Sequence, residues 1–119
     1  MLPEPGDIAW VELDPVKGGE QAGRRPALIV SDRLYHEVSR RALICPISRT
    51  DRPWPFNVPL PGGLKTDGAV LVDQIRAIDR NARMFDIIER APTKVVAEVR
   101  GRLAALLGFD LLSARGERR

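Results

Sequence analysis

A glycine-spaced segment at residues 18–26 carries the side chains in this chain that are best suited to phosphate chemistry. Glycines let the backbone approach a ligand closely. A guanidinium presents a planar fork of donors that matches phosphate oxygens and keeps its charge at neutral pH. The segment opens directly into the apolar run Ala27-Leu-Ile-Val30, which would hold Arg25 in place, so it predicts a phosphate-binding rim. The alternative is a solvated turn whose arginines serve only solubility. The polar side chains of interest are Glu20, Gln21, Arg24 and Arg25.

A second polar group, Ser48-Arg49-Thr50, comes directly after the apolar run Ala42–Ile47. The two apolar runs are joined by one polar connection, so we expect them to form neighbouring strands of a hairpin. That arrangement would place Ser48 beside Arg25. A hydroxyl donor next to a fixed guanidinium, with a carboxylate nearby, is the minimum set for breaking a phosphodiester through attack of the adjacent ribose 2′-hydroxyl.

The apolar pattern predicts six short strands that position these groups. Alternation and short apolar runs bounded by turn residues are typical of strands. Segment 56–60 contains an internal proline, which confines it to an edge of the sheet. Segment 69–75 is apolar enough to lie centrally. The segments are 8–13, 27–30, 42–47, 56–60, 69–75 and 83–88.

The last element changes to a helical period, with Thr93 expected to cap its start and Gly108 to end it. Its apolar stripe consists of Val95, Val96, Val99, Leu103, Leu106 and Leu107. Together these elements predict a mainly β fold, a small, strongly bent antiparallel barrel with one C-terminal α-helix. We expect a single domain over residues 1–112 and a flexible cationic tail at 113–119. Spare apolar surface on the helix favours a homodimer.

Composition sets further bounds. With 119 residues and 44% apolar content, the chain can bury a core without disulfide or metal support. Cys45 is the only cysteine and lies in an apolar run, so it is expected to be an inert core thiol in a reducing, cytosolic setting. Residues 1–7 lack the pattern of a signal peptide, and no apolar run approaches the length of a membrane span. These features predict a soluble, cytoplasmic protein.

The net charge of +3 favours an acidic partner such as nucleic acid or an acidic protein segment. Sixteen of the 19 basic residues are arginines, which agrees either with phosphate binding or with a GC-rich coding sequence. One cysteine and one histidine cannot supply a tetrahedral zinc site. The single histidine, His36, also excludes a two-histidine ribonuclease mechanism, and we expect it to be solvated.

Four segments, in order and at similar separations, resemble the MazF/PemK/Kid toxins of bacterial toxin-antitoxin pairs. The resemblance covers nearly the whole chain. It implies an SH3-like barrel that acts as a homodimeric, sequence-specific endoribonuclease without metal or other cofactor. It also implies cleavage to 2′,3′-cyclic phosphate and 5′-hydroxyl ends, and neutralisation by a MazE-like antitoxin with an acidic C-terminal segment. The segments are 6–10, 14–27, 45–48 and 67–75.

The resemblance also assigns roles to single residues. Arg25 takes the position of the catalytic arginine, Ser48 that of a hydroxyl residue that is more often threonine, and Glu20 that of a functional acidic residue of the loop. We expect Arg25 to stabilise the charge of the pentacoordinate phosphorus and Ser48 to donate a second hydrogen bond. In this family the arginine has been assigned acid-base work as well, but a guanidinium makes a poor base near neutrality, so Glu20 is the better candidate for the base. Glu20 could equally be a substrate-positioning group. Gly19 stands where the family has serine.

Further residues are predicted to contact RNA, and the set is Lys17, Gln21, Arg24, Arg49, Thr50, Trp54 and Arg83. Trp54 could stack a base or pack on its proline-rich turn, and Phe56 could stack a base or fill the core. Trp10 is most simply a core residue. Asp73-Gln74 could be a buried polar pair or a substrate contact. For Arg76, Arg80 and Arg83, lining an RNA path and merely solvating a surface are equally consistent with the sequence.

Two other functions compete with this one. A barrel toxin like CcdB poisons gyrase through a hydrophobic Trp-Gly-Ile ending, whereas this chain ends Gly116-Glu-Arg-Arg119. A plain nucleic-acid-binding barrel would bind RNA with a steep salt dependence and leave it uncut.

Overall fold

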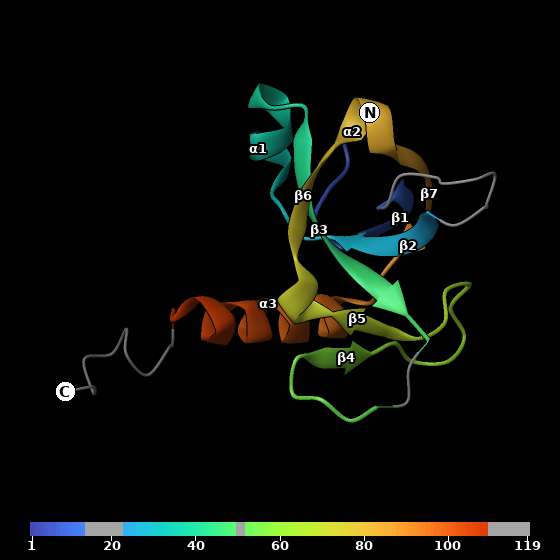
Figure 1. Ribbon diagram of the computed structural model, residues 1–119, viewed down its shortest axis with the longest axis vertical. Helices are drawn as coiled ribbons and strands as arrows, with labels where there is room; N and C mark the ends of the chain where they lie inside the picture. The colour runs from blue at the N-terminus through green and yellow to red at the C-terminus, as the bar shows by residue number, and fades with distance from the viewer. Residues whose placement is uncertain (14–22, 50–51, 110–119) are drawn as a thin grey trace.

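The computed structural model describes residues 1–13, 23–49 and 52–109. Within these ranges the chain forms seven strands, three α-helices and one 3-10 helix (Figure 1). In chain order they are β1 Asp7–Glu12, β2 Arg24–Ile29, α1 Arg33–Val38, β3 Arg41–Ser48, β4 Asn57–Pro59, β5 Ala69–Leu71, η1 Val72–Gln74, β6 Arg76–Asp79, α2 Arg80–Arg83, β7 Met84–Arg90 and α3 Thr93–Leu107.

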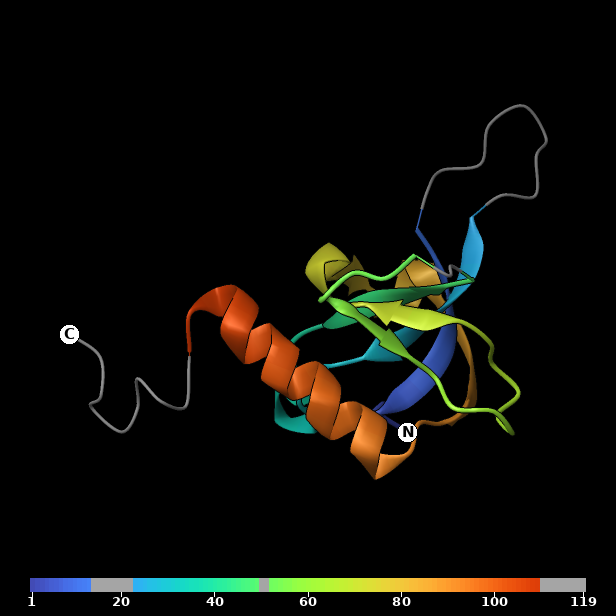
Figure 2. The same ribbon diagram turned by 90° about the horizontal axis from the view of Figure 1, so that it is seen from below.

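Strand β3 organises the sheet because it pairs with three other strands. One edge pairs with β2, with Ala27 opposite Pro46. The other edge is shared, since the N-terminal half of β3 pairs with β6 and its last two residues pair with β5. All pairings are antiparallel, in the order β4-β5-β3-β2-β1-β7. The sheet therefore curls into a small barrel, which confirms the predicted mainly β, SH3-like fold with a C-terminal helix (Figure 2).

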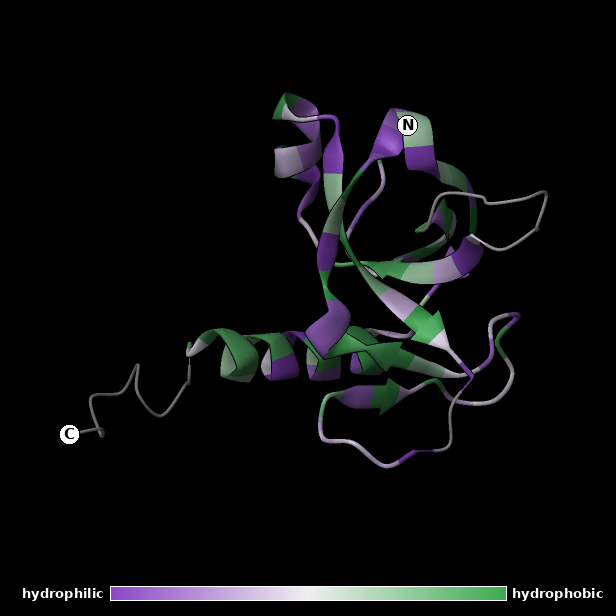
Figure 3. Cartoon of the chain, in the orientation of Figure 1, coloured by the Kyte–Doolittle hydropathy of each residue, from purple (hydrophilic) through white to green (hydrophobic). Residues whose placement is uncertain are grey.

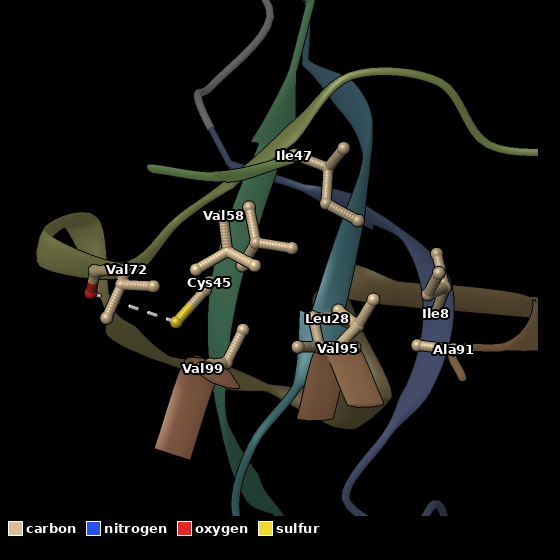
Figure 4. Packing of buried hydrophobic residues seen from close by; sticks show 10 residues of the cluster. Ile8, Leu28, Cys45, Ile47, Val58, Val72, Ala91, Val95 and Val99 are labelled. Carbon is tan, nitrogen blue, oxygen red and sulfur yellow. Dashed lines mark hydrogen bonds between the residues drawn. The ribbon is translucent and has the colours of Figure 1, made fainter. Parts of the chain in front are cut away.

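The main core lies between the sheet and α3. Val95 and Val99 of the helix pack against Leu28, Cys45 and Val58 of the strands (Figure 4). In Figure 3 the hydrophobic colour runs along β5 and the end of β3, where the sheet faces this helix. Each such side chain contributes about 1.5–3 kcal/mol when fully buried. A second cluster fills the other end of the barrel, with Val11, Ile29 and Ile44 among its members.

Helix α3 departs from the prediction at both ends. Its N-cap is Pro92, without a side-chain cap, so Thr93 is the first helical residue and does not cap the helix. Gly108 ends the helix in the left-handed conformation, as predicted. Leu106 and Leu107 are exposed, since the last turns extend past the sheet (Figure 2). The apolar stripe is therefore covered only over its first half.

Two local features differ from the strand prediction. Residues 33–38 form a short helix whose N-cap, Asp32, accepts a hydrogen bond from the Leu34 N–H, and this helix lacks the apolar stripe that would predict it. The expected strand 69–75 divides into β5 and η1. This bend lets the chain pass from one end of β3 to the other, where the unpredicted strand β6 pairs with Arg41–Ile44.

Cys45 is fully buried, and its Sγ lies 3.8 Å from the Val72 carbonyl oxygen (Figure 4). Burial, with a smaller contribution from the charge of Asp73, raises the pKa of the Cys45 thiol to about 12. Because the thiolate is the reactive species, we expect a disulfide reagent at pH 8 to label the folded protein at least about 10³-fold more slowly than the protein in 6 M guanidinium chloride. Thiol release measured over time checks this, and comparable rates would contradict the buried placement.

The described residues contain no helix long and apolar enough to cross a membrane. The expected domain end at residue 112 and the tail at 113–119 lie outside the described residues.

Candidate active site

Arg24 and Arg25 were expected at the end of a loop, but they lie on a strand. They are the first two residues of β2, where they pair with Glu12 and Val11 of β1. The hairpin is closed by a hydrogen bond from the Leu13 N–H to the Gly23 carbonyl oxygen, 3.0 Å long. A regular sheet therefore fixes the backbone of both arginines, while both side chains are exposed.

The register of the sheet brings Arg25 next to Ser48, as predicted. The β2–β3 pairing ends at Ala27 opposite Pro46, and extending this register by two residues along each strand, beyond the last paired residues, sets Arg25 opposite Ser48. Side chains at facing positions lie on the same side of a sheet. Both residues line a hollow of about 370 Å³, which we call the central pocket. It is also lined by Leu13, Pro46, Ile47, Leu71, Gln74 and Arg76.

Ser48 also borders two further hollows, so three adjoining pockets meet at this residue. The first, of about 470 Å³, is the arginine pocket, which includes Trp10, Arg24, Arg25, Arg49, Lys65 and Asp67. The second, of about 490 Å³, is the tryptophan pocket, which includes Arg52, Trp54, Asn57, Asp73 and Gln74. Arg25 lines the arginine pocket and the central pocket, and Ser48 lines all three, so the arginine–hydroxyl pair lies where these hollows adjoin.

Trp10 lines the arginine pocket, so the prediction that it is a core residue is wrong. Its side chain is 41% exposed, facing outward beside Pro26 while its neighbours Ala9 and Val11 are buried. Arg24 shares this pocket, and its guanidinium lies 3.9 Å from the ring centroid of Phe85 on β7. Such a cation–π contact restrains a long side chain. An aromatic surface and a restrained cation thus occur together, as expected of a nucleotide-binding surface.

Trp54 is held in the tryptophan pocket by a specific contact. Its indole N–H donates a 2.9 Å hydrogen bond to Oδ2 of Asp73, and its side chain is 49% exposed. The Phe56 ring lies 5.9 Å away, tilted by 56°, and packs against the main core, which matches the core alternative for that residue. Trp54 is therefore oriented and accessible for base stacking.

Asp73 and Gln74 are exposed, so the buried-pair alternative is wrong for both. Of the three later arginines, Arg76 lines the central pocket. Arg80 instead donates to the carbonyl oxygens of His36 and Ser39, at 2.9 and 2.7 Å. Arg83 donates to the carbonyl oxygen of Glu12 at 3.4 Å and lines none of the three pockets.

His36 is not the solvated residue that was expected. It is 2% exposed, and its Nδ1 lies 2.8 Å from the Pro3 carbonyl oxygen, so Nδ1 carries the proton. Its Nε2 lies 2.6 Å from the Ser31 hydroxyl, which also accepts from the Leu43 N–H. His36 holds the N-terminal segment through its hydrogen bond to the Pro3 carbonyl oxygen, and it lines none of the three pockets.

Several predicted residues lie outside the described residues: Lys17, Glu20, Gln21 and Thr50. The expected catalytic carboxylate is among them. Residues that the sequence did not single out line the pockets instead, notably Lys65 and Asp67 after the Pro61-Gly-Gly63 turn. Within the described ranges, no three His, Cys, Asp or Glu side chains gather as metal ligands.

Gly68 fixes the backbone beneath Ser48. It has a φ of +122°, and a Cβ there would lie 2.8 Å from the carbonyl carbon of Ser48. Real Cβ atoms do not approach backbone that closely, so only glycine allows β5 to begin directly against β3.

Replacing Gly68 by Ala should therefore displace Ser48 as well as strain the backbone. We expect a loss of about 1–3 kcal/mol in the free energy of unfolding, together with impaired activity of the site in the fraction that remains folded. Gly62→Ala is the matched control, because a Cβ there meets nothing within 4 Å. Urea unfolding and a single-turnover activity assay check both variants. Equal behaviour of the two alanine variants would contradict the close approach.

Comparison with known proteins bears on this geometry. Residues 4–107 match the model of the "PemK-like, MazF-like toxin of type II toxin-antitoxin system" family. This chain belongs to that family. It is 41% identical to the endoribonuclease PemK of Escherichia coli, over 87% of this chain and 81% of the relative. It is 40% identical to the endoribonuclease toxin MazF of Escherichia coli K12, over 69% of this chain and 73% of that one.

Solved structures of MazF toxins have the same fold. The MazF crystal structure from Deinococcus radiodurans superposes with a TM-score of 0.80 at 40% identity, covering 91% of this chain and 98% of that one. A MazE–MazF complex from the same organism gives a TM-score of 0.82 at 38% identity, covering 92% and 99%. The resemblance to MazF/PemK toxins that the sequence indicated is therefore confirmed, and both curated relatives carry the enzyme class predicted for this chain.

Proposed function

We propose that this PemK/MazF-like toxin is an endoribonuclease that cuts single-stranded RNA at specific sequences, with Arg25 and Ser48 acting on the scissile phosphate. The observation that carries the proposal is that these two residues, from the neighbouring strands β2 and β3, line the central pocket together. A permanent cation and a hydroxyl donor on neighbouring strands can bind two oxygens of one phosphate.

The proposed reaction needs no metal ion and no other cofactor. The ribose 2′-oxygen attacks the phosphorus while its proton passes to a base, the P–O5′ bond breaks, and the 5′-oxygen takes a proton from water. The products are a 2′,3′-cyclic phosphate and a 5′-hydroxyl. Arg25 neutralises the charge added in the pentacoordinate state and Ser48 donates to one of its oxygens, a stabilisation worth several kcal/mol in a preorganised site.

We assign the role of base to Glu20, because a carboxylate accepts a proton near neutrality and a guanidinium does not. The flanking pockets would bind the neighbouring nucleotides. Trp54 would stack a base on one side, while Arg24 and Arg49 would bind the RNA on the other. Loop residues Lys17, Gln21 and Thr50 remain predicted contacts. Arg83 is a weaker candidate for an RNA contact, since its guanidinium donates a hydrogen bond to the Glu12 carbonyl oxygen.

The same surface explains the proposed partner. Arginines and Lys65 outnumber the acidic side chains around the arginine and central pockets, so an acidic C-terminal segment of a MazE-like antitoxin would compete with RNA there. A homodimer is part of this proposal, because Leu106, Leu107 and Phe109 leave apolar surface uncovered. So is action in the cytoplasm, where the RNA substrate is found.

Incubating the purified protein with a long single-stranded RNA in EDTA tests this function. We expect cuts at a short recurring sequence, with cyclic phosphate ends, that disappear when the nucleotide 5′ to the cut carries 2′-deoxyribose. Binding without cuts would indicate a plain RNA-binding barrel. Inhibition of gyrase without cuts would indicate a CcdB-like toxin. Either result would overturn the proposal.

A further inference from the structure

The connection between β4 and β5, at residues 60–68, forms one wall of the arginine pocket. Lys65, Thr66 and Asp67 of this segment line the pocket, across from Trp10 and Arg24 of the sheet. Lys65 is exposed and brings an ammonium group to a surface that already carries Arg24, Arg25 and Arg49. Asp67 is the carboxylate among its lining residues, so cations dominate this pocket.

One carboxylate ties this wall to the sheet. Glu89 of β7 accepts hydrogen bonds from the Lys65 N–H at 3.0 Å, the Thr66 N–H at 2.8 Å and the Thr66 hydroxyl at 2.6 Å. Burial alone would raise the pKa of Glu89, but the Thr66 and Lys65 hydrogen bonds and the Lys65 charge lower it below its usual value. Glu89 is therefore ionised at neutral pH and can accept all three bonds at once.

The far end of the wall is fixed as well. The Leu60 N–H donates to the Gly68 carbonyl oxygen at 2.9 Å, and Gly68 packs on the backbone of Ser48. The backbone of Lys65 is thus held directly by the Glu89 carboxylate, within a segment whose two ends, Leu60 and Gly68, are joined beside the strand that carries Ser48. A lysine whose backbone is held this way loses less conformational freedom when it binds a ligand.

We propose that Lys65 binds a backbone phosphate of the RNA next to the scissile one, and that Glu89 is a positioning residue that holds Lys65 there. The inference rests on the proposed function. An ammonium is a compact point charge suited to phosphate. Arg25 and Ser48 line both the arginine pocket and the central pocket, so Lys65 lies in the hollow next to the one proposed for the scissile phosphate. The ligand is thus the RNA backbone, whatever its base sequence.

The test compares Lys65→Ala, Glu89→Gln and the double variant on an RNA oligonucleotide taken from a mapped cut site. Lys65→Ala should raise KM about 10-fold and leave kcat within about twofold. Binding of the uncleavable 2′-deoxy oligonucleotide should lose about 0.7 from the slope of log Kd against log salt. Glu89→Gln should raise KM in the same direction, and add nothing further in the Lys65→Ala background.

Matched controls separate positioning from stability. Lys94→Ala on α3 and Glu37→Gln on α1 make the same substitutions at exposed charges away from the pockets and should leave KM and the salt slope unchanged. Thr66→Val removes one of the three bonds to Glu89 with little change in shape, so it should raise KM about 2–3-fold even if Glu89→Gln folds poorly.

Each outcome decides one claim. An unchanged KM and salt slope in Lys65→Ala would overturn the phosphate contact. A KM increase from Glu89→Gln that persists in full without Lys65 would show that Glu89 acts on the fold and does not position Lys65. If the wild-type protein binds RNA and never cuts it, the proposed function fails, while the salt slopes still decide this inference.

Discussion

Arg25→Ala is expected to reduce kcat for RNA cleavage by about 10³-fold or more, a loss typical of an arginine that stabilises a phosphoryl transition state. The side chain is exposed at the start of β2, so its removal should change the free energy of unfolding by no more than about 0.5 kcal/mol. Affinity for an uncleavable 2′-deoxy oligonucleotide should fall far less than kcat, because the guanidinium acts chiefly on charge that develops during the reaction. Single-turnover kinetics and fluorescence anisotropy measure the two quantities.

Two comparison variants sharpen this result. Arg25→Lys keeps the charge but loses the two-pronged geometry, so it should fall between wild type and Arg25→Ala. Arg33→Ala removes an exposed arginine paired with Glu37 on α1, away from the pockets, and should leave cleavage unchanged. Near-normal kcat in Arg25→Ala would remove Arg25 from the mechanism.

Ser48→Ala is expected to reduce kcat by about 10²-fold, the cost of removing one hydrogen-bond donor to a developing oxyanion. Ser48→Thr should restore most of the activity, since it keeps the hydroxyl at the same backbone position. The pair separates the hydroxyl from the packing of the strand end, and single-turnover rates with thermal unfolding of both variants provide the measurement. Equal rates for the alanine and threonine variants, whether high or low, would contradict a role for the hydroxyl.

The Arg25–Ser48 pair of the candidate site could be predicted because it depends on local sequence signals. The apolar runs at 27–30 and 42–47 are short, uninterrupted and joined by one connection, so they had to be neighbouring strands. Extending their register past the last pair, Ala27 and Pro46, sets Arg25 opposite Ser48. Residues at the ends of a hairpin can be paired from sequence because few registers bury both apolar faces.

The walls of the site depend on where distant parts of the chain return to β3. Lys65 and Arg76 reach the pockets because β5 and β6 share one edge of that strand, and a bend at Val72–Gln74 makes this possible. The apolar run 69–75 carries no signal for that bend. The same tertiary pairing determines that Asp73 is exposed, although it directly follows the apolar run 69–72.

Trp10 shows a different limit of predicting burial from the apolar pattern of a strand. An aromatic residue within an apolar strand is consistent with a core position or with the floor of a groove, and only the neighbouring elements distinguish them. Here β2 and β7 leave the outer face beside Trp10 open and the 60–68 segment borders it, so the indole lines a pocket. The sequence pattern could not show the burial of His36 either, because this burial depends on contact with the distant residue Pro3.

The central claim is that Arg25 and Ser48 bind one and the same phosphate. A crystal structure of the protein with an RNA oligonucleotide that carries 2′-deoxyribose at the cleavage position measures this directly. We predict that the Arg25 guanidinium and the Ser48 Oγ each lie within about 3.2 Å of an oxygen of the scissile phosphate. Contacts to two different phosphates, or a scissile phosphate bound outside the central pocket, would contradict the account.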